Sequence, residues 1–206
     1  MYHRTFRMPQ LSEKARALYV VAYGAERYER YSDTHTTPHG ASPPYFDDRA
    51  HTYTPPEFYH RPEHDVESIY WSMVSALLHV RPTAVEAEPE APKVFMEAWE
   101  DLLKHRIPDP DEGYCDPRAN FLSKKPAEWS KLLLGDLKSL GPLLEDISRQ
   151  VRPEYALCGD GLLPDHLHEA VQRLILQYLV DYNDTPIPLD PNRLRPIPKL
   201  QRSIVA

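Results

Sequence analysis

Histidines are the residues of this sequence that most readily suggest chemistry, because imidazole is the commonest metal ligand in proteins. The chain holds 10 of them. His166 and His168 flank Leu167 at the start of an expected helix, and that spacing points the two rings to different faces. Zinc-binding helices of the peptidase type need histidines four residues apart, and Gln172 stands four residues after His168. We therefore expect exposed histidines at a helix start, and no metal site.

Cysteines and paired carboxylates are the other residues that could do chemistry. Cys115 and Cys158 have no C-x-x-C partner and no evident base beside them, so we expect small buried or half-buried side chains. Asp47 and Asp48 are adjacent in an expected loop, which offers no geometry for acid–base catalysis. The sequence therefore predicts no catalytic residue, no cofactor site and no metal site.

Composition and charge limit the class of protein. A chain of 206 residues forms one or at most two domains, and its net charge of −7 argues against nucleic-acid and anionic-membrane partners. Its 22 prolines exclude long strands, and its 7 glycines leave little material for phosphate-binding loops. The longest apolar run near the N-terminus, Leu18–Tyr23, is too short to span a bilayer. Residues 1–10 lack the apolar core of a secretory signal, so we expect an intracellular protein, cytoplasmic or nuclear.

One expected helix, at about residues 65–80, dominates the organisation of the chain. Asp65 is a good N-cap, and Glu67 lies in the first turn, where the helix dipole favours a carboxylate. At 100° per residue the apolar side chains cover roughly 220° of its circumference. Such a helix is expected to be central and surrounded on most sides.

Further helices and proline-rich connections complete the expected all-α architecture. Residues 11–31 form one helix with Ser12 as N-cap, or alternatively contain a short strand at 18–23. Pro92 opens an amphipathic helix, and others follow Pro126, Pro142 and either Pro164 or Asp165. The expected parts are an N-terminal helix (1–31), a proline-rich loop (32–63), a helical domain (64–182) and a proline-rich tail (183–206). That tail either packs on its own domain or is a ligand for a polyproline-reading domain.

Two short blocks of sequence resemble the fungal-type protein kinase family. TPPEF (Thr54–Phe58) is similar to a relic of the Ala-Pro-Glu motif, and RPEHDVESIYWSM (Arg61–Met73) is similar to the His-Asp-Val-Glu-Ser block that follows it in that family. Weaker echoes are AWEDLL (Ala98–Leu103) and ANFLSK (Ala119–Lys124). The resemblance covers roughly residues 50–180. It implies a truncated kinase-like large lobe built around the helix at 65–80.

The resemblance also implies roles for three residues. Asp65 is expected to open the central helix and to accept backbone N–H bonds from a catalytic loop. Glu57 is expected to pair with an arginine of a later helix, for which the sequence offers Arg149, Arg152 and Arg173. Trp71 completes the block and belongs to the core. All three roles are architectural, since none of these residues touches ATP.

The catalytic parts of a protein kinase are missing from the sequence. Phosphoryl transfer needs a lysine on the phosphates, an aspartate and an asparagine in the catalytic loop, and a magnesium-binding aspartate. The chain has no G-x-G-x-x-G, V-A-I-K, H-R-D or D-F-G, and His3-Arg4-Thr5 lacks the aspartate. We therefore expect that this chain alone does not bind ATP in the manner of a kinase.

Three functional hypotheses follow. The first is a catalytically inactive kinase-like remnant that acts as a binding or scaffold module, with a protein partner or self-association expected. The wide apolar sector of its central helix is then covered either by residues 11–31 or by a second chain. The second is a C-terminal fragment of a fungal-type Ser/Thr protein kinase whose ATP-binding and catalytic parts lie outside this chain. The third is an unrelated helical interaction domain.

Overall fold

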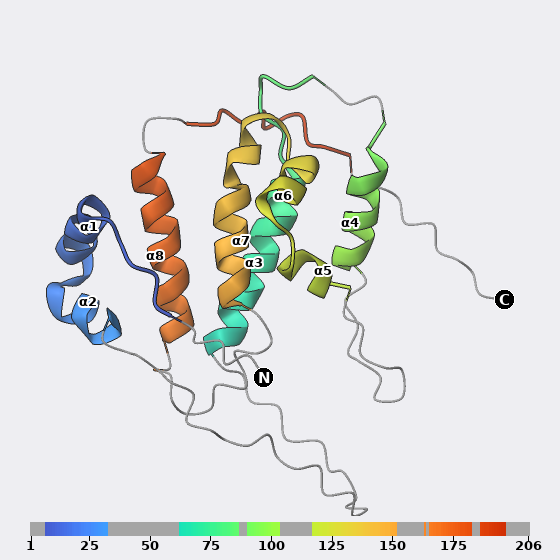
Figure 1. The fold of residues 1–206 in the computed structure, drawn as a ribbon. Coiled ribbons are helices and arrows are strands. Elements are labelled where there is room, and N and C mark those ends of the chain that lie inside the picture. The colour runs from blue at the N-terminus through green and yellow to red at the C-terminus, as the bar shows by residue number, and fades with distance from the viewer. Residues whose placement is uncertain are drawn as a thin grey trace, which may run out of the picture. The chain divides into compact units, whose positions relative to one another are not determined.

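The fold is mostly helical in the part of the chain that the structure describes. This computed structural model describes residues 7–32, 62–86, 90–103, 117–151, 163, 165–182 and 186–196. Within these ranges no sheet forms, and one antiparallel bridge joins Pro82 to Leu189 (Figure 1). The predicted all-α class is confirmed. The connector at 33–61 and both cysteines fall outside the described ranges.

The chain divides into two compact units. Unit 1 comprises residues 1–68 and 150–180, and unit 2 comprises residues 69–149 and 181–206. The helices of unit 1 are α1 (Glu13–Tyr23), α2 (Ala25–Ser32) and most of α8 (His166–Asp181). The helix α3 (Pro62–His79) begins in unit 1 and ends in unit 2.

The N-terminal segment forms two helices instead of the single helix predicted for residues 11–31. Ser12 caps α1 as predicted, because its hydroxyl accepts the Ala15 N–H at 3.4 Å. Gly24 then takes φ +88° and ψ 152°, a conformation that is nearly restricted to glycine and that ends α1. Residues 18–23 are helical, so the alternative of a strand is wrong.

The helix α3 differs from its prediction in where it starts. It begins at Pro62, three residues before Asp65, because proline's fixed φ suits a first helical position. Asp65 is therefore inside the helix and is not its N-cap. The residues Val66, Tyr70, Trp71, Val74 and Leu78 are buried on one side, whereas Ile69 is 55% exposed. Met73, Leu77 and Val80 are half-buried, so most of the predicted apolar sector is removed from solvent and only its edge at Ile69 and Ala76 is exposed.

Unit 2 contains the helices that follow α3. They are α4 (Lys93–Leu103), α5 (Ala119–Leu122), α6 (Pro126–Leu132), the 3-10 helix η1 (Gly135–Leu140) and α7 (Gly141–Gln150), of which only the last residue belongs to unit 1. The predicted buried face of α4 is confirmed at Phe95, Ala98, Trp99 and Leu102. The helix α5, which has four residues, was not predicted. The helix predicted after Pro126 was expected to continue through Leu140, but it ends at Leu132 and the separate 3-10 helix η1 follows it. Gly135, the first residue of η1, has a φ of +49°.

The C-terminal segment lies on its own unit. Residues 186–190 have no helical structure and Leu189 forms the bridge to Pro82, after which the chain turns at Pro191 and Asn192. Figure 1 draws this segment in red above α6 and α4. Of the two alternatives for the tail, packing on its own domain is the one that residues 186–196 follow.

Candidate functional site

Trp71 of the kinase-like block lies in an aromatic core of unit 2. Its side chain is 7% exposed, and its ring meets Phe121 of α5 edge to face at 6.2 Å between centroids. The Arg118 guanidinium stacks over the indole at 4.9 Å. Phe121 in turn contacts Trp129 of α6 at 5.7 Å. Trp71 therefore occupies the core, as predicted, and holds α3, α5 and α6 together.

The other two residues carried over from the resemblance have different outcomes. Asp65 is exposed in the first half of α3, so it is not part of the aromatic core that contains Trp71. Glu57 and Arg152 both lie outside the described residues. The other candidate arginines are engaged locally, since Arg149 bonds Glu145 and Arg173 bonds Glu169.

A buried ion cluster joins α1, α2 and α8 in unit 1. Glu169 and Arg173 are one helical turn apart on α8, both side chains are 0% exposed, and Arg173 Nε lies 2.8 Å from Glu169 Oε1. The Tyr19 hydroxyl donates to the same oxygen at 2.5 Å, and Arg27 Nε donates to Glu169 Oε2 at 3.1 Å. Glu169 therefore accepts bonds from all three helices. We call Tyr19, Arg27, Glu169 and Arg173 the Glu169 cluster.

Arg173 extends the Glu169 cluster to the end of α2. Its Nη1 donates to Ser32 Oγ at 3.1 Å, and its Nη2 donates to the Tyr28 carbonyl at 2.9 Å. The guanidinium also stacks over the Tyr28 ring at 4.3 Å. A buried cation is stable only when its donors are satisfied, and here each of the three nitrogens has an acceptor.

The Glu169 cluster changes the titration of Tyr19. Burial, followed by the hydrogen bond to Glu169, raises the pKa of Tyr19 to about 12. The hydroxyl therefore stays protonated and keeps donating to the carboxylate across the ordinary pH range. Because the donors of Tyr19 and Arg173 point at one shared carboxylate oxygen, the cluster is suited to holding helices together.

His166 differs from its prediction as an exposed residue. Its side chain is fully buried in the first turn of α8. Burial, followed by the charge of Arg173, lowers the pKa of His166, so the ring is held neutral. The spacing of residues 166, 169, 170 and 173 could have indicated this burial, because these residues share one helical face. His166 therefore lies on the same buried side of α8 as Glu169 and Arg173.

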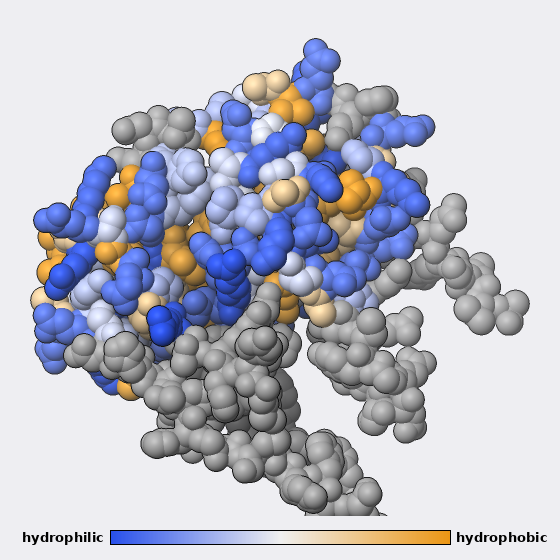
Figure 2. All heavy atoms as spheres, in the orientation of Figure 1, coloured by the Kyte–Doolittle hydropathy of each residue, from blue (hydrophilic) through white to orange (hydrophobic). Residues whose placement is uncertain are grey.

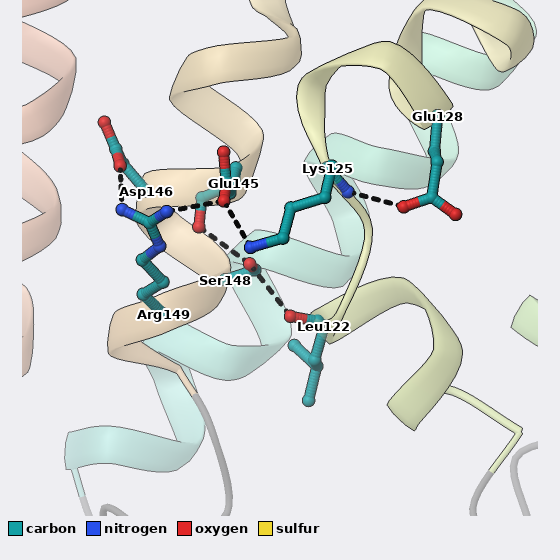
Figure 3. Close-up of polar contacts among 7 residues, drawn as sticks. All are labelled: Leu122, Lys125, Glu128, Glu145, Asp146, Ser148 and Arg149. Atoms are coloured by element: carbon teal, nitrogen blue, oxygen red, sulfur yellow. Dashed lines mark hydrogen bonds and ion pairs between the residues drawn. The ribbon is translucent and has the colours of Figure 1, made fainter. Parts of the chain in front are cut away.

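A second polar cluster lies on the surface of unit 2 (Figure 3). Glu145 of α7 accepts bonds from Lys125 Nζ at 3.0 Å and from Arg149 Nη2 at 2.5 Å. Ser148 donates to the Leu122 carbonyl at 3.1 Å, which ties α7 to the end of α5. Burial acts to raise the pKa of Glu145, but the bonds from Lys125 and Arg149 outweigh it and lower that pKa. Both cations are more than half exposed, so this cluster contributes little stability.

The C-terminal segment at 186–196, which turns at Pro191 and Asn192, contacts a surface that we call the tail-docking surface, formed by residues 79–83, Phe95 and Leu132. Three backbone hydrogen bonds join the two: Thr83 N–H to Pro188 O at 2.9 Å, Asp190 N–H to Arg81 O at 3.0 Å, and Arg195 N–H to His79 O at 2.8 Å. The Arg195 side chain is buried, with Nη1 2.6 Å from Leu132 O and its guanidinium 3.6 Å above the Phe95 ring. This surface thus holds a non-helical peptide segment of the chain itself.

Two searches for other kinds of site concern the described ranges alone. No group of three or more His, Cys, Asp or Glu side chains in them could hold a metal ion. No helix in them combines the length and the apolar character that crossing a membrane requires.

Comparisons with known proteins give no relative for this chain. Scans against family models, curated proteins and solved structures find no match. The resemblance to fungal-type kinases therefore stays a hypothesis that depends on the sequence blocks alone.

Proposed function

We propose that this chain is a catalytically inactive, kinase-like remnant that works as a protein-binding scaffold. The observation that carries the proposal is the contrast between the two faces of α1. On one face Tyr19 is fixed by Glu169, and on the other Leu18 is 50% exposed and Val21 is 87% exposed. Figure 2 shows apolar side chains at the surface in this region.

An apolar strip on a firmly held helix favours association. Removing apolar surface from water contributes about 25 cal/mol per Å². Because the Glu169 cluster already holds α1, a partner would not have to order this helix when it binds, and that lowers the cost of binding. The simplest partner is a second copy, since a two-fold interface uses the same patch on both subunits.

The association can be tested by sedimentation equilibrium over a range of protein concentrations. The wild-type mass is expected to rise with concentration, and Val21→Glu is expected to abolish that rise by placing a charge in the interface. Val94→Glu is the matched control, because Val94 is also exposed (41%) but lies on α4. A monomer at every concentration that nevertheless binds an apolar dye would contradict self-association.

The kinase-like part of the proposal is supported by the block at 64–71 and by the burial of Trp71. The expected inactivity is supported by the missing catalytic motifs. It predicts that MgATP does not raise the melting temperature of the purified chain and is not hydrolysed by it. Measured nucleotide turnover would overturn the proposal.

A second candidate is a C-terminal fragment of a fungal-type Ser/Thr kinase, which the same block favours. Its test is the genomic sequence upstream of Met1. An in-frame H-R-D motif followed by D-[FL]-[GD] would assign the activity to a longer parent protein. This chain would then have a structural role in the large lobe of that kinase.

A further inference from the structure

We infer that the tail-docking surface is a binding site for a proline-flanked peptide that turns at its centre and carries one arginine anchor, which residues 186–196 occupy within the chain. This inference rests on the proposed binding function and names the class of partner. The tail shows what the surface accepts, because the described contacts between the two are already those of a peptide complex.

Most of the recognition is made through the main chain. The bonds of Thr83, Arg81 and His79 go to backbone atoms of the tail and are independent of its side chains. Adding an extended segment through backbone pairing is a common mode of peptide recognition. Prolines suit such a ligand, because a peptide restricted to extended conformations loses less entropy on binding.

Arg195 supplies the specificity. Its guanidinium is buried on the Phe95 ring and donates to Leu132 O, whereas Leu194 is 60% exposed and the Arg193 side chain is 69% exposed. An arginine can stack and donate together, and a lysine cannot reproduce that geometry. The surface therefore recognises one arginine at a defined spacing from Leu189, the residue that forms the bridge to Pro82.

The tail must compete with any such partner. A segment tethered to its own site has an effective concentration of about millimolar, so an incoming peptide binds weakly until the tail is released. The structure thus describes a site that is blocked by its own chain.

The test uses the full chain in a form that releases the tail. Arg195→Ala removes the anchor, and Asp190→Pro in the same chain removes the N–H that donates to Arg81 O. A fluorescent synthetic peptide of residues 186–196 is then titrated against this release variant and against wild type. We expect at least about tenfold tighter binding to the release variant, because the wild-type site is filled.

Two peptide variants separate recognition from non-specific binding. A peptide with Arg195→Ala is expected to bind about 10- to 100-fold more weakly, since it loses a buried charged hydrogen bond. A peptide with Arg193→Ala is the control and is expected to bind like the unmodified peptide. Hydrogen exchange of the Thr83 amide reports occupancy: it should be slow in wild type, fast in the release variant, and slow again with peptide.

Two results would overturn the inference. The first is no binding of the unmodified peptide by the release variant, with the Thr83 amide exchanging fast. The second is a wild-type dimer that disappears in the release variant, which would assign the surface to the tail of a second copy. Neither result depends on Val21 of α1, so a failure here is distinguishable from a failure of the proposed association.

Discussion

Replacing Glu169 with glutamine is expected to destabilise unit 1 far more than the same change at a surface glutamate. The substitution keeps the size of the side chain and removes its charge, so that Arg173 stays buried without its carboxylate. Removing one member of a buried ion pair costs about 3–5 kcal/mol. Arg27 adds less than about 1 kcal/mol, because its side chain is 41% exposed and therefore screened. The free energy of unfolding of a whole domain is only about 5–15 kcal/mol, so this loss should be easy to measure.

The matched control for this prediction is Glu145→Gln. Glu145 also makes ion pairs with two cations, but those cations are 63% and 53% exposed, so we expect a loss of about 1 kcal/mol or less. Thermal unfolding followed by circular dichroism compares the two variants. All three tryptophans lie in unit 2, so their fluorescence reports on that unit alone, and hydrogen exchange in α1 and α8 reports on unit 1.

Equal melting temperatures for the two variants, with unchanged exchange in α1 and α8, would refute the reasoning. A triple variant tests the cause further. Tyr19→Phe, Glu169→Met and Arg173→Met together remove the charges and the hydroxyl that depends on them. This variant is expected to be more stable than Glu169→Gln, because no unpaired charge is left in the interior.

Three further predictions follow from individual residues. The pKa of Tyr19 is raised from 10.0 to about 12, so this residue contributes stability that is fully present below pH 10 and is lost as the pH rises toward 12. Between pH 9 and 11.5 the melting temperature of the wild type should therefore fall more steeply than that of Tyr19→Phe. His166 has a lowered pKa, so its contribution is present above pH 6.5 and is lost as the pH falls below it; His166→Gln should flatten this acid limb of the stability curve. Gly135→Ala forces an alanine to φ +49° and places its Cβ 2.6 Å from Val85 Cγ2, which should cost about 1–3 kcal/mol. Adding Val85→Ala should recover part of that loss in tryptophan-monitored unfolding, and no recovery would exclude the clash.

The parts of the fold that could be predicted are those with a regular apolar spacing. The α4 face with Phe95 and Trp99 was found because side chains three and four residues apart face the same way. Trp71 was placed in the core for the same reason. The helix at 11–31 was predicted too long, because its apolar spacing continues past Gly24 and sequence alone does not show that this glycine adopts a positive φ.

The Glu169 cluster could not be predicted, because its members are charged residues that usually lie on surfaces. A Glu followed four residues later by Arg was a visible signal, and it is the favoured order for a helical pair. What made it a buried pair was the presence of Tyr19 and Arg27, some 140 residues away in sequence. Likewise the burial of Arg195 could not be predicted, because it depends on contacts with Phe95 and Leu132, which are distant in the sequence.

The contacts of Arg173 determine which substitutions unit 1 can tolerate. Its three nitrogens serve a carboxylate of α8, a hydroxyl and a carbonyl of α2, while the flat face of the same group lies on Tyr28. Lysine carries one compact charge on a flexible stem and can satisfy only part of this set. An exchange usually counted as conservative is therefore excluded at position 173, whereas Arg149, more than half exposed, can accept it.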